Sequence, residues 1–247
     1  MRASHCSISA AVTWEPRDLM SVETIPPGRE LLDDLDADQA MVERSLRNIA
    51  RANRWFGGVA AARFGLGRLL RTCPRRATLL DVGTGLGDVP RALVRAARAG
   101  GITLRPVGLE RHPAVARLAR REGLPTVLAD AVTLPLRDRA VDLVLVSQVA
   151  HHLAAADLVA LVTEASRVAR VGVILADLRP SRLAVLGFRL AARLLRFDQA
   201  TRRDGVISLR RGFTVAGLRN LLASGGITAR VVARPWARVV AVWSTAG

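Results

Sequence analysis

The chain carries LLDVGTGLGDVP at residues 79–90, where an apolar run passes into a glycine-rich turn and then into a helical pattern. Glycine has no Cβ, so Gly83, Gly85 and Gly87 permit a tight turn and a close approach of the backbone to a ligand. The stretch therefore predicts a strand, a ligand-binding turn and a helix in succession, as in an α/β fold.

The same alternation continues along the chain. Helical patterns occupy 88–99, 112–122 and 153–170. Five continuous apolar runs of strand length lie at 77–82, 103–109, 125–129, 141–147 and 171–177. Such runs indicate a parallel sheet covered on both faces. Two more strand-like runs, 226–234 and 237–245, predict an antiparallel hairpin, so we expect an α/β fold with a doubly wound, mostly parallel seven-stranded sheet.

The chain divides into three segments by pattern. Residues 1–36 show no interpretable pattern and are expected to be disordered or irregular. Residues 37–76 predict two helices. Residues 77–247 form the sheet domain, in which 179–213 is an insertion between the fifth strand and the final helix. Ligands of doubly wound sheets bind beyond the carboxyl ends of the strands, so we expect the functional site at that edge.

Composition excludes several classes of protein. The net charge is +16, from 37 basic and 21 acidic residues, and every basic residue is Arg, which is typical of a GC-rich coding sequence. Half of the residues are hydrophobic, which excludes a disordered chain. Arg interrupts every long apolar run, so we expect no membrane span, no signal peptide and a cytoplasmic protein. Cys6 and Cys73 alone build neither a disulfide framework nor a zinc cluster, and no metal site is predicted.

Three acids stand at the ends of consecutive predicted strands. The G-x-G-x-G spacing and the carboxylate of Asp88 disfavour a pyrophosphate at the turn. Glu110 lies 23 residues after Gly87, where a carboxylate can accept both hydroxyls of a ribose. Asp130 can accept the exocyclic amine of an adenine. With Asp81, these acids indicate a nucleoside-binding site for a neutral or cationic ligand.

The sequence resembles the class I S-adenosylmethionine-dependent methyltransferases, in particular their quinone, sugar and polyketide small-molecule subgroup. The resemblance rests on residues 79–90, Glu110, ADAVTLPLRDRAVDLVLVSQVAHHL at 129–153 and the closing hairpin. It implies a Rossmann-like methyltransferase fold, S-adenosylmethionine as cofactor and S-adenosylhomocysteine as product. The cofactor-binding residues that it implies are Asp81, Gly83, Thr84, Gly85, Gly87, Glu110, Arg111, Asp130, Ala131, Ser147 and Gln148.

A histidine pair, His151 and His152, follows the fourth strand, where the family often carries one. Methyl transfer is an in-line displacement, and a base can remove the proton of an attacking hydroxyl. Asp177, at the end of the fifth strand, can orient His151 and stabilise its imidazolium form. We therefore predict His151, His152 and Asp177 as catalytic residues. The alternative, one His capping a helix and the other packing against the pocket, stays open.

The run LRNIARANRWFGG at 46–58 resembles methyltransferases that sit beside type III polyketide synthases. In this fold, helices ahead of the first strand usually close over the site. The candidate substrate and lid residues are Asn53, Arg54, Trp55, Phe56 and Arg210. A structural role, with Trp55 and Phe56 simply buried, is the alternative.

The insertion contains a helical pattern at 181–197. Its arginines share one stripe of the helix: Arg182, Arg189, Arg193 and Arg196. Three interpretations are open: a lid over a hydrophobic substrate, a weak association with an anionic membrane surface, or a crossover helix whose arginines face solvent. Asp204 and Gly205 predict a turn after this helix.

These patterns favour methyl transfer to a small molecule, including a hydrophobic one. O-methylation of a phenolic or enolic polyketide or quinone-like substrate is the leading interpretation, with His151 as general base, and C-methylation is the alternative. An RNA methyltransferase is the rival, although the chain has no Tyr and only nine Phe and Trp for base stacking, so no specific nucleic acid is expected. A non-catalytic partner protein that binds the cofactor is a further class. The oligomeric state is not predicted.

Overall fold

The strands of the computed structural model form one sheet in the order β3-β2-β1-β4-β5-β7-β6. The strands are β1 (Arg76–Val82), β2 (Thr103–Glu110), β3 (Thr126–Leu128), β4 (Val141–Ser147), β5 (Ala169–Leu178), β6 (Arg230–Arg234) and β7 (Arg238–Ser244). Neighbours from β3 to β5 pair in parallel, whereas β7 runs antiparallel to both β5 and β6. The predicted doubly wound α/β fold with a closing hairpin is therefore confirmed.

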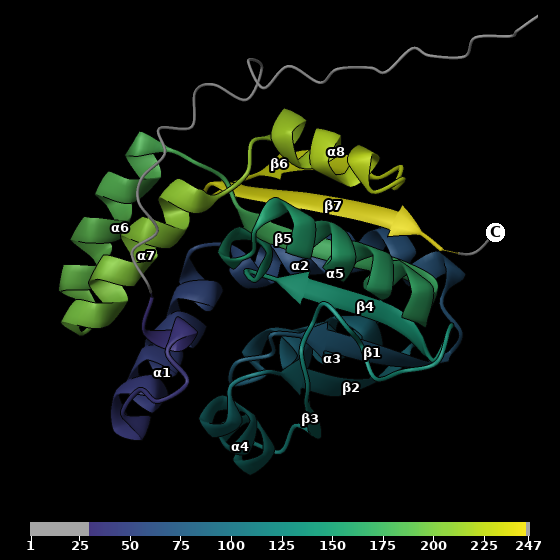
Figure 1. The fold of residues 1–247 in the computed structure, drawn as a ribbon, viewed down its shortest axis with the longest axis horizontal. Helices are drawn as coiled ribbons and strands as arrows, with labels where there is room; N and C mark the ends of the chain where they lie inside the picture. Colours follow the sequence, from purple (N-terminus) through teal and green to yellow (C-terminus); the bar gives the residue numbers. More distant parts are fainter. Residues whose placement is uncertain (1–29, 246–247) are drawn as a thin grey trace, which may run out of the picture.

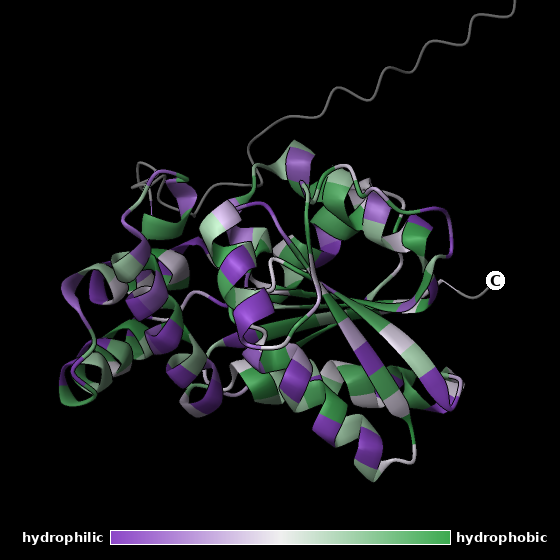
Figure 2. Ribbon diagram, turned by 90° about the horizontal axis from the view of Figure 1, so that it is seen from below, coloured by the Kyte–Doolittle hydropathy of each residue, from purple (hydrophilic) through white to green (hydrophobic). Residues whose placement is uncertain are grey.

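Both faces of the sheet are covered by helices that alternate hydrophilic and hydrophobic residues (Figure 2). The covering helices are α2 (Gly58–Leu69) and α3 (Asp88–Ala99) on one face, and α5 (Ala155–Val168) and α8 (Val215–Ser224) on the other. In β4, Leu143 and Leu145 pack toward α2 and α3, while Val144 and Val146 pack toward α5 and α8. Burial on both faces explains why the strands are apolar throughout.

Three further helices gather beyond the carboxyl ends of the parallel strands (Figure 1). They are α1 (Gln39–Trp55), α6 (Arg182–Leu194) and α7 (Gln199–Arg211). The carboxylate of Asp198 caps α7 by accepting the Thr201 N–H (2.9 Å), and it also accepts the side-chain amide of Asn48 in α1 (2.7 Å). The same residue thus starts α7 and ties it to α1. The remaining helix, α4 (Pro113–Arg121), packs beside β2 and β3.

The structure describes residues 30–245, so most of the segment 1–36 expected to be disordered or irregular lies outside the described residues. Within the described part, Leu31–Asp33 forms the 3-10 helix η2. Two more 3-10 turns are η3 (Leu70–Thr72) and η4 (Ala150–His152). Every helix between residues 30 and 245 is too short or too polar to cross a membrane.

The turn predicted at Asp204 and Gly205 is wrong, because both residues lie inside α7. Gly205 packs against the ring of Phe188 in α6, and a Cβ at this position would overlap with that ring. Phe188 is itself held between Phe56 (ring centroids 6.0 Å apart) and Phe197 (6.4 Å). The glycine thus serves the close approach of α6 and α7 rather than a turn.

We expect Gly205→Ala to lower the free energy of unfolding by about 1–3 kcal/mol, because the new methyl group overpacks against a ring that has little room to move. Gly187→Ala is the matched control, since a Cβ there meets nothing within 4 Å. This second change in α6 should stabilise the protein by about 0.5–1 kcal/mol through helix propensity. Urea denaturation of both variants checks the pair, and equal effects of the two changes would contradict the packing argument.

Candidate active site

A cavity of about 700 Å³ lies between the carboxyl ends of the parallel strands and helices α1, α6 and α7. This volume is in the range of small-molecule sites. The predicted site residues that line it are Asn53, Phe56, Asp81, Gly83, Thr84, Gly85, Glu110, Arg111, Asp130, Ala131, Ser147, Gln148, His151 and His152. Gly87 lies behind the lining as the N-cap of α3, and Asp177 lies behind it as the partner of His151.

Three predicted lid residues lie away from the cavity. Trp55 is 62% exposed, and the guanidinium of Arg54 lies over its ring at 5.9 Å. Arg210 is exposed on α7. Asn53 and Phe56 turn inward at the end of α1, and neighbouring helical positions point about 100° apart, so Arg54 and Trp55 point outward. Trp55 therefore neither lines the cavity nor packs in the protein interior.

The glycine turn after β1 has the backbone that its sequence predicts. Gly83, Gly85 and Gly87 have φ angles of 67°, 54° and 73°, in the left-handed region. A Cβ on Gly83 would overlap with Val149. At Gly85 a Cβ would meet only the side chain of Leu46, at 3.6 Å, so this backbone is open toward the cavity.

Asp81 is a buried acid with one oxygen unpartnered. Its Oδ2 accepts the hydroxyl of Thr84 at 2.6 Å, while Oδ1 has no hydrogen-bond partner among the described residues. Burial raises the pKa of Asp81 to about 8, and the charges of Asp88 and Glu110 add to the rise against the Thr84 hydrogen bond. A cationic group in the cavity would restore the ionised carboxylate, which fits the ammonium and sulfonium of S-adenosylmethionine.

Glu110 and Asp130 complete the acidic side of the cavity. Glu110 accepts the backbone N–H groups of Arg111 (2.9 Å), His112 (3.1 Å) and Gly85 (3.4 Å), and burial raises its pKa despite these bonds. Within residues 30–245, Asp130 accepts only a local N–H, from Val132, at 3.0 Å. Both carboxylates thus retain accepting capacity toward a ligand.

A chain of hydrogen bonds that the sequence did not predict joins α1 to the strand ends. Asn53 Nδ2 donates to Asp88 Oδ2 (3.1 Å), and Asn53 Oδ1 accepts from Gln148 Nε2 (2.5 Å). Gln148 Oε1 accepts from Arg238 Nη1 (2.6 Å), and Arg238 Nε donates to the carbonyl of Phe56 (2.9 Å). Burial lowers the pKa of Arg238 to about 10. This series of hydrogen bonds fixes the end of α1 against β4 and β7.

His151 and Asp177 form a buried pair at the ends of β4 and β5. His151 Nδ1 lies 2.6 Å from Asp177 Oδ1. Burial opposes ionisation of Asp177, but the charge of His151, its hydrogen bond and the Leu178 N–H together hold the pKa of this carboxyl below its usual value. His151 Nε2 is buried and has no hydrogen-bond partner among the described residues. The pair therefore leaves one ring nitrogen available at the cavity.

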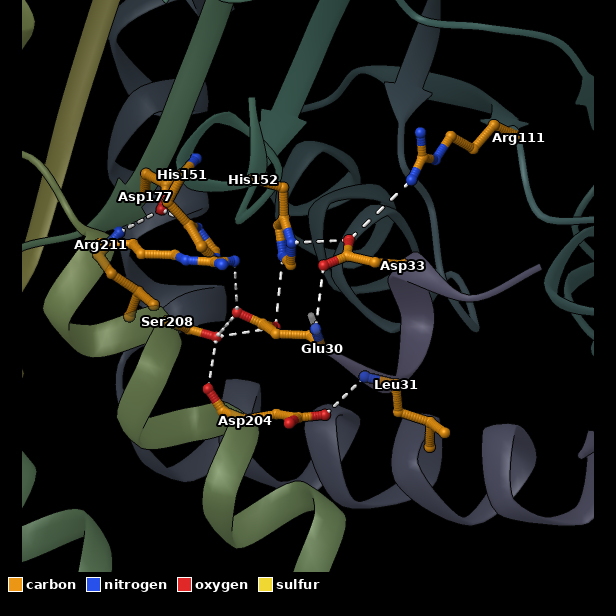
Figure 3. A network of polar contacts seen from close by, with 11 residues as sticks. Glu30, Leu31, Asp33, Arg111, His151, His152, Asp177, Asp204, Ser208 and Arg211 are labelled. Carbon is orange, nitrogen blue, oxygen red and sulfur yellow. Dashed lines mark hydrogen bonds and ion pairs between the residues drawn. The ribbon is translucent and has the colours of Figure 1, made fainter. Parts of the chain in front are cut away.

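His152 belongs to a second network, with the N-terminal strap, which we define as residues 30–33 (Figure 3). Its ring nitrogens lie 3.3 Å from Asp33 Oδ1 and 3.7 Å from Glu30 Oε2. Glu30 also accepts the hydroxyl of Ser208 (3.0 Å) and pairs with Arg211 (3.4 Å). The strap is thereby fastened across the cavity to α7, and its buried Glu30 has its pKa raised by burial.

The ion pair that holds the strap to His152 should depend on pH. Burial lowers the pKa of His152, but the close contact with Asp33 and the charges of Glu30 and Asp33 raise it overall. Against burial, the same contact and the Glu30 N–H lower the pKa of Asp33 to about 2. The pair is fully formed between the ordinary values of 3.8 for Asp33 and 6.5 for His152, and is lost as the pH rises through the folded pKa of His152 or falls toward that of Asp33.

We therefore expect the amides of Leu31–Asp33 to exchange slowest near pH 5–6, after correction for intrinsic rates, and faster above neutrality. Hydrogen exchange with mass spectrometry checks this. His152→Gln should remove the alkaline change. Equal protection at pH 6 and pH 9 in the unchanged protein would contradict the ion pair.

The sequence did not predict several residues that line the cavity before α1, in α7 and at the start of β7: Glu30, Asp33, Asp204, Ser208 and Arg238. The available signal was charge. Residues 30–38 contain five acids, whereas 179–238 contains 13 Arg and two acids, and Glu30 pairs with Arg211 between these segments. Distance along the chain hid the contact, since these residues lie 181 positions apart.

A parallel sheet with a glycine turn after β1 and acids at the ends of β1 and β2 defines a nucleoside-binding α/β enzyme. Residues 80–176 match the family model of the methyltransferase domain. This match and the order of the strands indicate an S-adenosylmethionine-dependent methyltransferase, in agreement with the resemblance.

Solved structures show the same fold. An S-adenosylmethionine-dependent methyltransferase from Aquifex aeolicus is 16% identical with a TM-score of 0.56, and the match covers 84% of this chain and 98% of that one. Magnesium protoporphyrin IX methyltransferase from Synechocystis, with bound S-adenosylhomocysteine, is 14% identical with a TM-score of 0.50, covering 76% and 83%. No curated protein sequence matches the chain. At these identities the likeness concerns the fold alone.

Proposed function

We propose that the enzyme methylates the hydroxyl oxygen of a small phenolic or enolic acceptor, of the polyketide or quinone-like type. The observation that carries the proposal is the His151–Asp177 pair, 2.6 Å apart, with a free and buried Nε2 at the cavity. A ring held through one nitrogen by a buried carboxylate is arranged to accept a proton at the other nitrogen.

The cofactor end of the cavity is the acidic one. When bound, S-adenosylmethionine supplies the methyl group as an electrophile. We assign its methionine part to Asp81 and the turn 83–87, its ribose to Glu110, and its adenine to Asp130 and Ala131. Thr84 keeps Asp81 in place. The remaining assigned contacts are Arg111, Ser147 and Gln148, which line the same cavity.

The acceptor end is apolar with one polar corner. Its apolar lining includes Phe56, Phe188, Leu178 and Leu209, and the polar corner is made by His151 together with residues of the strap. This shape suits a flat apolar body with a hydroxyl at one end. As the oxygen attacks, His151 Nε2 takes the hydroxyl proton, and Asp177 stabilises the resulting imidazolium before the proton leaves to water.

The test is methyl transfer to a panel of resorcinols, catechols and hydroxyquinones, with the full chain and methyl-labelled cofactor. We expect a mass gain of one methyl group, placed on oxygen by NMR. A methyl group found on ring carbon would replace the proposal with C-methylation. Transfer to RNA with none to any phenol would overturn it, and the acidic lining of the cavity argues against a phosphate backbone there.

A further inference from the structure

Helix α6 carries a row of leucines on its outer surface. Leu183, Leu186, Leu190 and Leu194 are 81%, 66%, 62% and 75% exposed. At 100° per residue they occupy one stripe about 80° wide. Scattered exposed leucines are ordinary, but a continuous row on one helix is typical of a surface that another apolar phase covers.

Arginines border this row. Arg182, Arg189 and Arg193 are exposed and lie along one side of the leucine stripe, while Arg196 follows the end of the helix. The arginines thus face solvent, as the crossover interpretation expects, but so do the leucines, which that interpretation does not explain. Helix α6 itself contains no acidic residue. We define the α6 face as Leu183, Leu186, Leu190 and Leu194 with these three arginines of the helix.

The α6 face continues to the mouth of the cavity. Leu183 and Gly187 contribute both to the outer surface and to the cavity lining. Trp236, at the tip of the β6–β7 hairpin, also lines the cavity and is 66% exposed. The apolar row and an exposed indole therefore share the rim of the cavity.

We infer that the α6 face docks the enzyme on an anionic lipid surface, with the leucines inserted among the acyl chains and the arginines at the lipid phosphates. A long arginine side chain can lie along apolar surface and still place its charge at the headgroups. A second copy of the chain is the poorer occupant, because a twofold contact on this face would bring the arginines of both copies together without an acid on α6 to pair them.

Docking in this orientation turns the cavity mouth toward the lipid. An apolar acceptor dissolved in the bilayer would then enter without crossing water; this consequence rests on the proposed function, whereas docking itself does not. Vesicle binding and methyl transfer are therefore measured in separate assays, so that a negative result in one assay does not affect the interpretation of the other.

The experiment is flotation of the full chain with vesicles of phosphatidylcholine alone or of an equimolar mixture with phosphatidylglycerol. We expect binding to the mixed vesicles only, weakened by salt. The double variant Leu186→Gln/Leu190→Gln should lower the partition coefficient at least about tenfold. Its control, Met41→Gln/Val127→Gln, removes exposed apolar side chains elsewhere and should bind as the unchanged protein does.

A second pair of matched variants tests the contribution of the arginine charges. Arg189→Glu/Arg193→Glu should weaken binding to the mixed vesicles by about tenfold or more, whereas Arg95→Glu/Arg98→Glu, with the same change of net charge on exposed α3 positions, should have a much smaller effect. Unchanged protein that stays unbound overturns the inference. So does light scattering that shows a dimer dissociated by the leucine change. Equal losses in both arginine variants would also overturn it, because they would mean attraction by net charge alone.

Discussion

His151→Ala should lower kcat by about 10²–10⁴ at neutral pH while leaving the affinity for S-adenosylmethionine unchanged. The ring nitrogen Nε2 is the one assigned to the acceptor, because Nδ1 is engaged by Asp177 at 2.6 Å. Without the base, the acceptor must ionise unaided. Activity of the variant should therefore climb as the pH approaches about 10, the ordinary pKa of a phenol, where phenolate attacks directly.

Asp177→Asn tests the positioning role of the carboxylate. The amide cannot stabilise the imidazolium and favours the wrong tautomer of His151, so kcat should again fall steeply with a rising pH profile. Calorimetry with the cofactor and thermal unfolding serve as controls for folding. Turnover of His151→Ala at the rate of the unchanged enzyme, with intact cofactor binding, would remove the base from the mechanism and favour a structural role for the histidine.

Affinity for S-adenosylmethionine should rise by up to about tenfold per pH unit between pH 6 and about 7.5, because Asp81 must lose a proton to receive a cationic ligand, and the rise should end near pH 8, where the ammonium of the cofactor begins to lose its own proton. The sign follows from burial, which raises the pKa of Asp81 to about 8, so the free enzyme holds the proton at neutral pH. Binding near pH 7 should accordingly release a proton, visible by calorimetry in buffers of different ionisation enthalpy.

Asp81→Asn should abolish this pH dependence and weaken the cofactor at pH 8 by about 10–100-fold, the value of a charge-assisted contact. Asp157→Asn, at an exposed position of α5, is the matched control and should retain the dependence. A flat affinity profile in the unchanged protein would contradict the assignment of Asp81 to the cationic part of the cofactor.

The parts of the site that could be read from the sequence are local ones. The turn 83–87 is recognisable because only glycine tolerates its φ angles, and Glu110 because the length of one strand–helix–strand unit sets its distance from the turn. His151 and Asp177 lie within hydrogen-bond distance because the parallel neighbours β4 and β5 end side by side.

What the sequence determined by itself is the alternation of buried strands and amphipathic helices, and with it the sheet and the acids at its strand ends. Local periodicity and turn chemistry suffice for that. Only the tertiary structure decided how distant segments surround the cavity: Glu30 against Ser208 and Arg211, Arg238 behind Gln148, and α6 with its leucines outward. Periodicity shows that a helix has an apolar stripe, but whether that stripe meets protein or solvent depends on packing between distant segments, which no local pattern records.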